Sequence, residues 1–402
     1  MGTRDDKGRS DTGLLERLTR MARRGPIPLG LQLPEGAVPE TNSVRTPVWF
    51  GAIATVLTFV FAWVAFVLFE NKFPDGVLEI WRRWDTIHYL TIARDGYSDE
   101  GASRILIIWQ PLYPWLIRVL RWLAGGYLGA GLFISFVAYL AAMIGLYRLV
   151  GLDFPERIAS RAVIYISIFP AAYFFHAAYT EALFLALVVW SFLFARQRRW
   201  ALAGLMAGLA SLTRITAFGL LPALLFEYFA SKRFRWREVR ADVLYLLLIP
   251  AGFGVYLWVN HSVYGTPFAF LEMNRIQNHK VLSPPWVGAR SVWGSGLGSG
   301  PNRFLVVGVS EVVAGVASGV VALYGLLRLR TSYAIYMFLS WATFAFTSFW
   351  ASTTRYLLPL FPGFILLALW GERKPVHWTL CVSFVMAYSL LLALFVRGRW
   401  AF

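Results

Sequence analysis

Apolar stretches long enough to cross a lipid bilayer recur along most of this chain of 402 residues, and they limit the folds that are open to it. The first of them, residues 48–69, contains no charged side chain. A helix needs about 20 mostly apolar residues to cross a bilayer. Only 15% of the residues are charged, whereas soluble domains have about 25%. The sequence therefore predicts an all-α polytopic membrane protein and excludes an ordinary soluble domain.

The net charge of +16 raises the alternative of a nucleic-acid-binding protein. The Lys and Arg residues stand in short runs between the apolar stretches, however, which is typical of the cytoplasmic ends of membrane helices. We therefore expect no nucleic-acid partner. Residues 1–46 are predicted to form a basic cytoplasmic tail, and residues 47–402 a single transmembrane domain. The one cysteine, Cys381, excludes an intramolecular disulfide and a zinc site made of thiolates.

Three apolar stretches have basic runs at both ends, so each must cross the membrane an even number of times. Each also has polar residues near its middle, and an Arg at the centre of a lipid-facing span costs about 3 kcal/mol. We therefore expect three helical hairpins whose turns lie at the outer face. They are residues 161–196 with Glu181 at the turn, residues 199–232 with Arg214, and residues 330–373 with Arg355.

Two long polar segments fall outside by the same count, residues 70–125 and residues 261–302. Within the first, residues 111–124 are apolar but too short for a full span, and they contain Arg118 and Arg121. This pattern predicts an amphipathic helix on the outer surface. The total is then about eleven spans, with the N-terminus in the cytoplasm.

The densest polar cluster of the first outer segment lies in residues 81–97. On a helix, Asp85, His88 and Asp95 share one face, and Trp84 lies beside them. A carboxylate next to aromatic side chains is a candidate general base, because partial desolvation raises its basicity. The alternative is an interfacial helix whose aromatic residues sit among lipid headgroups and whose charges are merely solvated.

Arg214 and Arg355 are two cations expected at the outer face between helices, where they suit a phosphate or pyrophosphate group. Two alternatives remain open: the arginines extend toward lipid headgroups, or they pair with Glu181. Glu181 in turn is suited, with Thr180, to capping the helix that returns from the turn. For His176 a packing role is favoured. No Gly-rich phosphate loop follows a strand.

Several stretches together carry a resemblance to a known family. They are residues 83–97 (with Trp84-Asp85-Thr-Ile-His88), 110–114 (Gln-Pro-Leu-Tyr-Pro), 169–184, 203–214, 264–270, 284–286 and 355–362. In this order the chain resembles the PIG-V family, the second mannosyltransferases of GPI-anchor assembly, with their prokaryotic relatives. These are GT-C membrane glycosyltransferases, which use dolichyl- or polyprenyl-phosphate sugars. The likeness covers about residues 47–370. Gln110 departs from it, since an aromatic residue usually precedes that proline.

The resemblance implies a GT-C fold whose first outer loop carries juxtamembrane helices, and it implies that Asp85 is the catalytic base. The donor would be a polyprenyl-phosphate-linked sugar, most simply mannose, and the acceptor a hydroxyl of a lipid, glycan or protein. His88 would orient Asp85 or bind a sugar hydroxyl, and Arg214 and Arg355 would stabilise the leaving phosphate. Further candidates for substrate contact are Trp84, Asp95, Gln110, Tyr113 and Glu181.

A transporter or flippase of a lipid-linked saccharide is the alternative function. That class favours paired internal repeats and broken helices in corresponding halves, and no repeat is evident in the sequence. No cofactor is predicted; some GT-C enzymes use a divalent metal, but the sequence offers no complete set of ligands. The expected location is a prokaryotic plasma membrane, or the endoplasmic reticulum in a eukaryote, with the active site on the outer face.

Overall fold

The computed structural model describes residues 44–278, 280–297 and 304–401, so all but the last few residues of the predicted cytoplasmic tail lie outside the described part. Within those ranges the chain is helical, and the only β-pairing is a single bridge between Leu282 and Thr347. The predicted all-α class is confirmed. The α-helices are α2 (Arg45–Glu70), α3 (Asp85–Asp95), α4 (Leu112–Leu120), α5 (Tyr127–Gly151), α6 (Glu156–Ser167), α7 (Glu181–Arg196), α8 (Trp200–Ser211), α9 (Leu220–Ser231), α10 (Leu248–Tyr264), α11 (Ala269–Asn278), α12 (Pro285–Leu297), α14 (Ser310–Arg328), α15 (Thr331–Ala345), α16 (Thr353–Tyr356), α17 (Phe361–Trp370) and α18 (Lys374–Val396).

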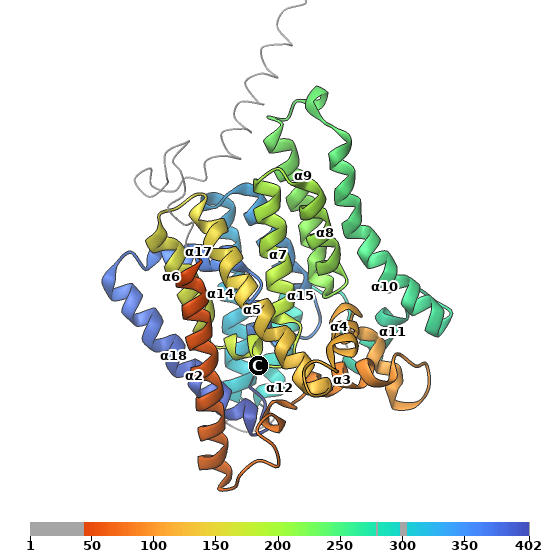
Figure 1. Cartoon of the computed structure of the whole chain (residues 1–402), viewed down its shortest axis with the longest axis vertical. Helices are drawn as coiled ribbons and strands as arrows, with labels where there is room; N and C mark the ends of the chain where they lie inside the picture. The colour runs from red at the N-terminus through yellow and green to blue at the C-terminus, as the bar shows by residue number, and fades with distance from the viewer. Residues whose placement is uncertain (1–43, 279, 298–303, 402) are drawn as a thin grey trace, which may run out of the picture.

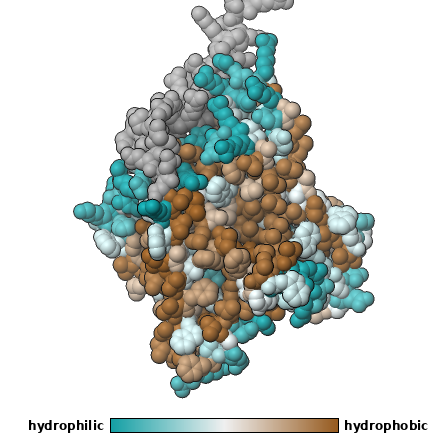
Figure 2. Space-filling model, in the orientation of Figure 1, coloured by the Kyte–Doolittle hydropathy of each residue, from teal (hydrophilic) through white to brown (hydrophobic). Residues whose placement is uncertain are grey.

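Five helical segments of the described chain are long and apolar enough to cross a membrane. They are α2, α5, Ala241–Tyr264 (the 3₁₀ segment η7, Ala241–Leu247, with α10), Phe304–Arg328 (the π-helical segment η8, Phe304–Val309, with α14) and α18. Figure 2 shows hydrophobic side chains gathered in a broad band across the middle of one face, with hydrophilic residues above and below it. This surface is that of a multi-pass membrane protein. The count of about eleven spans stays a prediction.

The three predicted hairpins are present as successive helices joined at a turn, α6 then α7, α8 then α9, and α15 then α17. The two helices of the first and of the second hairpin pack mainly on other helices, α6 on α5 and α17 and α9 on α15. The helices of these hairpins are shorter than a full membrane span. In α7, all but a few residues are buried between neighbouring helices. A short helix is stable at membrane depth where protein rather than lipid surrounds its ends. Helix α7 therefore belongs to the interior of the bundle, whereas α8 also exposes apolar side chains, Leu202 and Leu205.

The two predicted outer segments contain more helix than loop. The first holds α3 and α4, and α4 buries Tyr113 and Ile117 while Val119, on its other side, is 69% exposed. This is the amphipathic helix expected in residues 111–124. The second segment forms α11 and α12, and all four helices lie in the lower half of the molecule in Figure 1.

A partly buried ion cluster joins several helix ends at the C-terminal end of α7. Arg196, the last residue of α7, donates to Asp153 over 2.6 Å. Arg330, just before α15, donates to both carboxylate oxygens of Glu227 in α9, over 2.6 and 2.8 Å. Two guanidinium groups thus balance two carboxylates. The pairing offsets the cost of burying the charges. Arg196 also donates to the hydroxyl of Tyr333 in α15 over 2.9 Å, which fixes the end of α7 against α15.

Glycines allow α8 to pack backbone against backbone on η7 and α10. A Cβ atom on Gly204 would lie 2.1 Å from the carbonyl oxygen of Tyr245, and one on Gly208 would lie 2.6 Å from that of Leu248. From the other side, a Cβ on Gly252 would lie 2.3 Å from the carbonyl oxygen of Gly208. Small residues at fixed spacing permit this close approach between membrane helices. The packing explains the glycines of residues 203–214 and places the end of α8, from which Arg214 follows.

We expect Gly208→Ala to destabilise the protein by about 1–3 kcal/mol, because the added methyl group has no room against Leu248. The matched control is Gly254→Ala in α10, where nothing lies within 4 Å of the new Cβ and where alanine favours the helix. Thermal unfolding in detergent would compare the two. Equal unfolding temperatures for both variants would contradict the close packing of α8.

Candidate functional site

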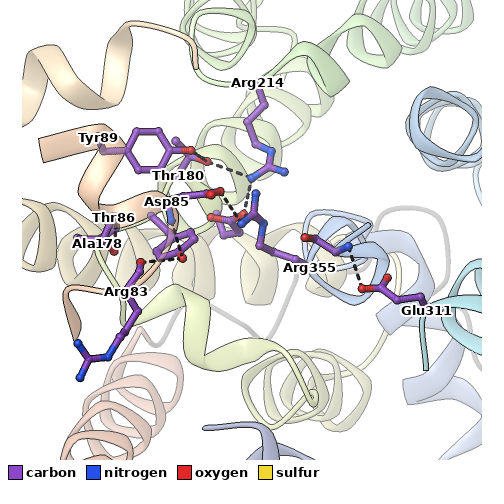
Figure 3. A network of polar contacts seen from close by, with 12 residues as sticks. Arg83, Asp85, Thr86, Tyr89, Ala178, Thr180, Arg214, Glu311 and Arg355 are labelled. Carbon is purple, nitrogen blue, oxygen red and sulfur yellow. Dashed lines mark hydrogen bonds and ion pairs between the residues drawn. The ribbon is translucent and has the colours of Figure 1, made fainter. Parts of the chain in front are cut away.

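The turns of the three hairpins meet at one place, and the start of α3 joins them there (Figure 3). Glu181 is the first residue of α7, and Arg214 immediately precedes η5 (Ile215–Gly219), which leads from α8 into α9. Arg355 lies in the four-residue helix α16. Asp85 is the first residue of α3. The predicted outer turns therefore bring together residues from four distant parts of the chain.

These four side chains form a charge-balanced network. Arg355 donates from Nη1 to Asp85 Oδ2 over 2.7 Å, and its Nε lies 2.8 Å from Glu181 Oε1. Arg214 pairs with the same Glu181 oxygen and also donates to Thr180 Oγ1 over 3.0 Å. The Glu181 side chain has no exposed surface, whereas that of Asp85 is 20% exposed. The sequence left open whether the two arginines pair with Glu181, and in the structure both of them do.

Asp85 owes its position to an unusual backbone conformation in the preceding residue. Trp84 has φ 48° and ψ −121°, in the region that favours glycine, and it directly precedes the first turn of α3. The hydroxyl of Tyr179 accepts a hydrogen bond from the Asp85 amide over 3.2 Å and donates to the carbonyl oxygen of Arg83 over 3.1 Å. Such strain in a bulky residue persists only where the surroundings hold it, and it is common at functional sites.

A buried carboxylate, that of Glu311, fixes the turn that precedes Arg355. Glu311, in α14, accepts hydrogen bonds from the backbone N–H groups of Ser352, over 2.8 Å, and Thr353. Ser352 has φ 62°, so the turn before α16 is left-handed. Glu311 lies on the far side of this turn from the network in Figure 3. Its two hydrogen bonds therefore fix the turn that presents Arg355.

The network opens into a cavity of about 900 Å³. Six of the residues singled out from the sequence line it, together with others that were not; the six are Trp84, Asp85, His88, Gln110, Arg214 and Arg355. A cavity of this size with a few converging polar groups is typical of a small-molecule site. The structure thus brings together the predicted base, its neighbouring imidazole and both predicted phosphate ligands.

His88 lies in the cavity wall with its ring against Trp109, the ring centres 4.4 Å apart. Burial lowers the pKa of His88, an effect that the negative charge of Asp85 partly opposes. The imidazole is therefore neutral at neutral pH, since the usual value is about 6.5. A neutral imidazole both donates and accepts a hydrogen bond, which suits contact with a sugar hydroxyl.

Three of the residues predicted to contact substrate do not line the cavity. Asp95, at the far end of α3, is exposed and outside the cavity lining, and a hydrogen bond from Arg94 lowers its pKa. Tyr113 is wholly buried and donates to the carbonyl oxygen of Gly131 over 2.9 Å, so it packs α4 onto α5. Glu181 does not line the cavity; it forms ion pairs with Arg214 and Arg355 and neutralises their charge. Helical spacing had aligned Asp95 with Asp85, but α3 carries it beyond the cavity.

Sequence reasoning missed Lys280 and Glu311. Lys280 lines the cavity, with its Nζ 5.7 Å from the ring centre of Tyr356. The signal for Glu311 was present, because it is the one acidic residue within the apolar residues 304–328. Ionisable residues within membrane segments usually have a structural or functional partner. His176 is buried against Tyr139, in agreement with the packing role favoured for it.

The described residues contain no group of three or more His, Cys, Asp or Glu side chains placed to hold a metal ion.

Residues 110–258 match the family model described as dolichyl-phosphate-mannose-protein mannosyltransferase. The matched part contains Glu181 and Arg214, whereas Asp85 and Arg355 lie outside it. The match supports a glycosyltransferase that acts in the membrane and leaves the finer resemblance to PIG-V a prediction. No curated protein sequence matches the chain.

Two kinds of solved structure are distantly similar. ArnT from Cupriavidus metallidurans bound to undecaprenyl phosphate is 13% identical, over 86% of this chain and 72% of that one, with a TM-score of 0.48. The Archaeoglobus fulgidus oligosaccharyltransferase in the apo form is 12% identical, over 88% of this chain, with a TM-score of 0.43. The match spans just over half, 56%, of the length of the oligosaccharyltransferase chain.

Proposed function

We propose that this protein is a membrane glycosyltransferase that transfers a sugar from a polyprenyl-phosphate-linked donor to an acceptor hydroxyl. The observation that carries the proposal is one cavity lined by a carboxylate, Asp85, and two guanidinium groups, Arg214 and Arg355. The family match over residues 110–258 supports the same class. Mannose as the sugar, a relation to PIG-V and an outer location of the site follow from the sequence resemblance and the charge pattern, and they are part of the proposal.

The reaction proposed is a single inverting displacement. Asp85 accepts the proton of the acceptor hydroxyl while the hydroxyl oxygen attacks C1 of the sugar. The bond from C1 to the phosphate oxygen breaks, and polyprenyl phosphate leaves with the electron pair. Arg214 and Arg355 stabilise the charge that develops on it, as preorganised donors do in other transfers of this kind. No general acid is needed, because the leaving phosphate is a stable anion.

The deciding experiment is sugar transfer in proteoliposomes from polyprenyl-phosphate mannose to a panel of glycolipid, glycan and peptide acceptors. Transfer to any of them, or slow donor hydrolysis that requires Asp85, supports a glycosyltransferase. Movement of the lipid-linked sugar between leaflets without transfer or hydrolysis would support the transporter or flippase instead. A panel of donors with other sugars tests the assignment of mannose.

Arg355→Ala is expected to raise the KM for the donor at least tenfold and to change the KM for the acceptor little, since loss of one charge-assisted contact to phosphate costs about 1.5–3 kcal/mol. The matched control is Arg94→Ala, which removes a guanidinium that is 64% exposed and pairs with Asp95 outside the cavity. Steady-state kinetics with each substrate varied in turn would measure both constants. An unchanged donor KM would show that Arg355 does not bind the donor phosphate.

A further inference from the structure

The carboxylate proposed as the base is already engaged in this structure. Asp85 Oδ2 accepts a hydrogen bond from Arg355 over 2.7 Å, and this guanidinium is 9% exposed. A carboxylate oxygen that already accepts a hydrogen bond from a guanidinium is less open to the hydroxyl whose proton it must take. The proposed reaction therefore requires a step that weakens the hold of Arg355 on Asp85 before the acceptor proton is taken.

Arg355 joins two carboxylates that differ in how accessible they are from the cavity. Glu181 has no exposed side-chain surface and is shared with Arg214, so its loss would leave two buried guanidinium groups facing each other. The Asp85 side chain is 20% exposed and lines the cavity, where water or a substrate hydroxyl can replace the guanidinium. The contact of Arg355 with Asp85 is thus the one of the two that a group in the cavity can reach and replace.

The cationic side chains that line the cavity outnumber the carboxylates of the network. Arg214, Arg355 and Lys280 all line it, whereas Asp85 and Glu181 are the carboxylates of the network. A phosphate entering the cavity would meet three cations. Arginine binds phosphate oxygens through two parallel hydrogen bonds, which a single carboxylate oxygen on Nη1 does not match. Phosphate is therefore a strong competitor for Arg355.

We propose that the phosphate of the lipid-linked donor takes the place of Asp85 on Arg355, and that this exchange of ion pairs frees the carboxylate to act as the base. The inference rests on the proposed function of the site. It makes the base available only when donor is bound, so the donor binds before the acceptor hydroxyl is deprotonated. After transfer, the acceptor proton is on Asp85 and the new negative charge is on polyprenyl phosphate, held by Arg355. The original pair re-forms once Asp85 has passed its proton to water in the cavity and the lipid phosphate has left.

The exchange predicts that Asp85 opposes the binding of lipid phosphate, in contrast to an ordinary substrate contact. The probe is undecaprenyl phosphate, and its affinity is measured for full-length protein in nanodiscs of zwitterionic phosphatidylcholine. Asp85→Asn is expected to bind the probe about tenfold more tightly than wild type, or by ~1.4 kcal/mol. Asp95→Asn is the matched control. It removes the same charge from the same helix outside the cavity, and its affinity should equal that of wild type.

Each other outcome overturns a defined part of the inference. Probe binding by Asp85→Asn that equals or falls below that of wild type rules out the exchange and leaves the proposed function standing. If Asp95→Asn increased the affinity for the probe equally, the effect would come from overall charge, and the ion-pair exchange would be ruled out. Absence of probe binding in wild type and variants alike overturns the proposed function, and the exchange with it. Asp85→Ser, checked by thermal unfolding, must show the same tightening if the asparagine variant does not fold.

Discussion

Replacing Asp85 with asparagine is expected to lower kcat for transfer by about 10²–10⁴-fold, the usual contribution of a positioned general base. Asparagine has nearly the same size as aspartate, and its side-chain oxygen can still accept a hydrogen bond from Arg355. The fold should therefore survive, and the unfolding temperature should stay close to that of wild type. Transfer measured at saturating donor and acceptor would isolate kcat.

Two comparisons make this result specific to Asp85. Asp95→Asn should transfer at the rate of wild type, because Asp95 is exposed and lies outside the cavity. The ion-pair exchange adds that Asp85→Asn lowers the KM for the donor while it lowers kcat. A variant that transfers at near the wild-type rate would remove Asp85 from its role as the base and turn attention to other polar residues of the cavity.

Glu181→Ala is expected to destabilise the protein by about 3–5 kcal/mol, the cost of removing one partner of a buried ion pair. Glu181 neutralises both Arg214 and Arg355. Without it, two guanidinium groups remain inside the protein with Asp85 as the one carboxylate of the network. The measurement is the unfolding temperature in detergent micelles, followed by the fraction that stays monodisperse after heating.

The matched control for Glu181 is Glu79→Ala, which removes a carboxylate paired with Arg82 at a position where both side chains are nearly half exposed. Exposed ion pairs contribute little to stability, so this variant should unfold as wild type does. A Glu181→Ala protein that is as stable as wild type but has a raised KM would support the prediction that Glu181 contacts substrate.

Much of the fold was predictable because the bilayer imposes simple rules. Apolar length and the positions of basic runs predicted an all-α membrane protein and the three hairpins, including the residues at their turns. The same pattern predicted the amphipathic helix that became α4. The lengths of the hairpin legs were less predictable, since they depend on which helices surround α7, and this is a property of the packed bundle.

The site was predictable in its residue types but less so in its connections. A charged residue in an apolar hairpin is least costly at the turn, where water can reach it, so Arg214 and Arg355 were expected at the turns. The partners of these arginines depend on how hairpins far apart in the chain pack, which spacing along one segment does not reveal. Asp95 shares a helical face with Asp85 but does not line the cavity, so spacing along α3 did not reveal which carboxylate faces it. Lys280 was missed because nothing in its own segment distinguishes it.

The network also sets an order for the assembly of the chain during synthesis. Arg214 follows Glu181 by 33 residues, so the pair can close as soon as the second hairpin enters the membrane beside the first. Arg355 follows Asp85 by 270 residues, which is roughly 15–55 s at the usual rate of translation. Asp85 can remain hydrated during that delay, since its side chain stays 20% exposed even in the folded protein, whereas that of Glu181 has no exposed surface. The buried charges thus pair early with a close neighbour, and the cavity is completed only when the last hairpin arrives.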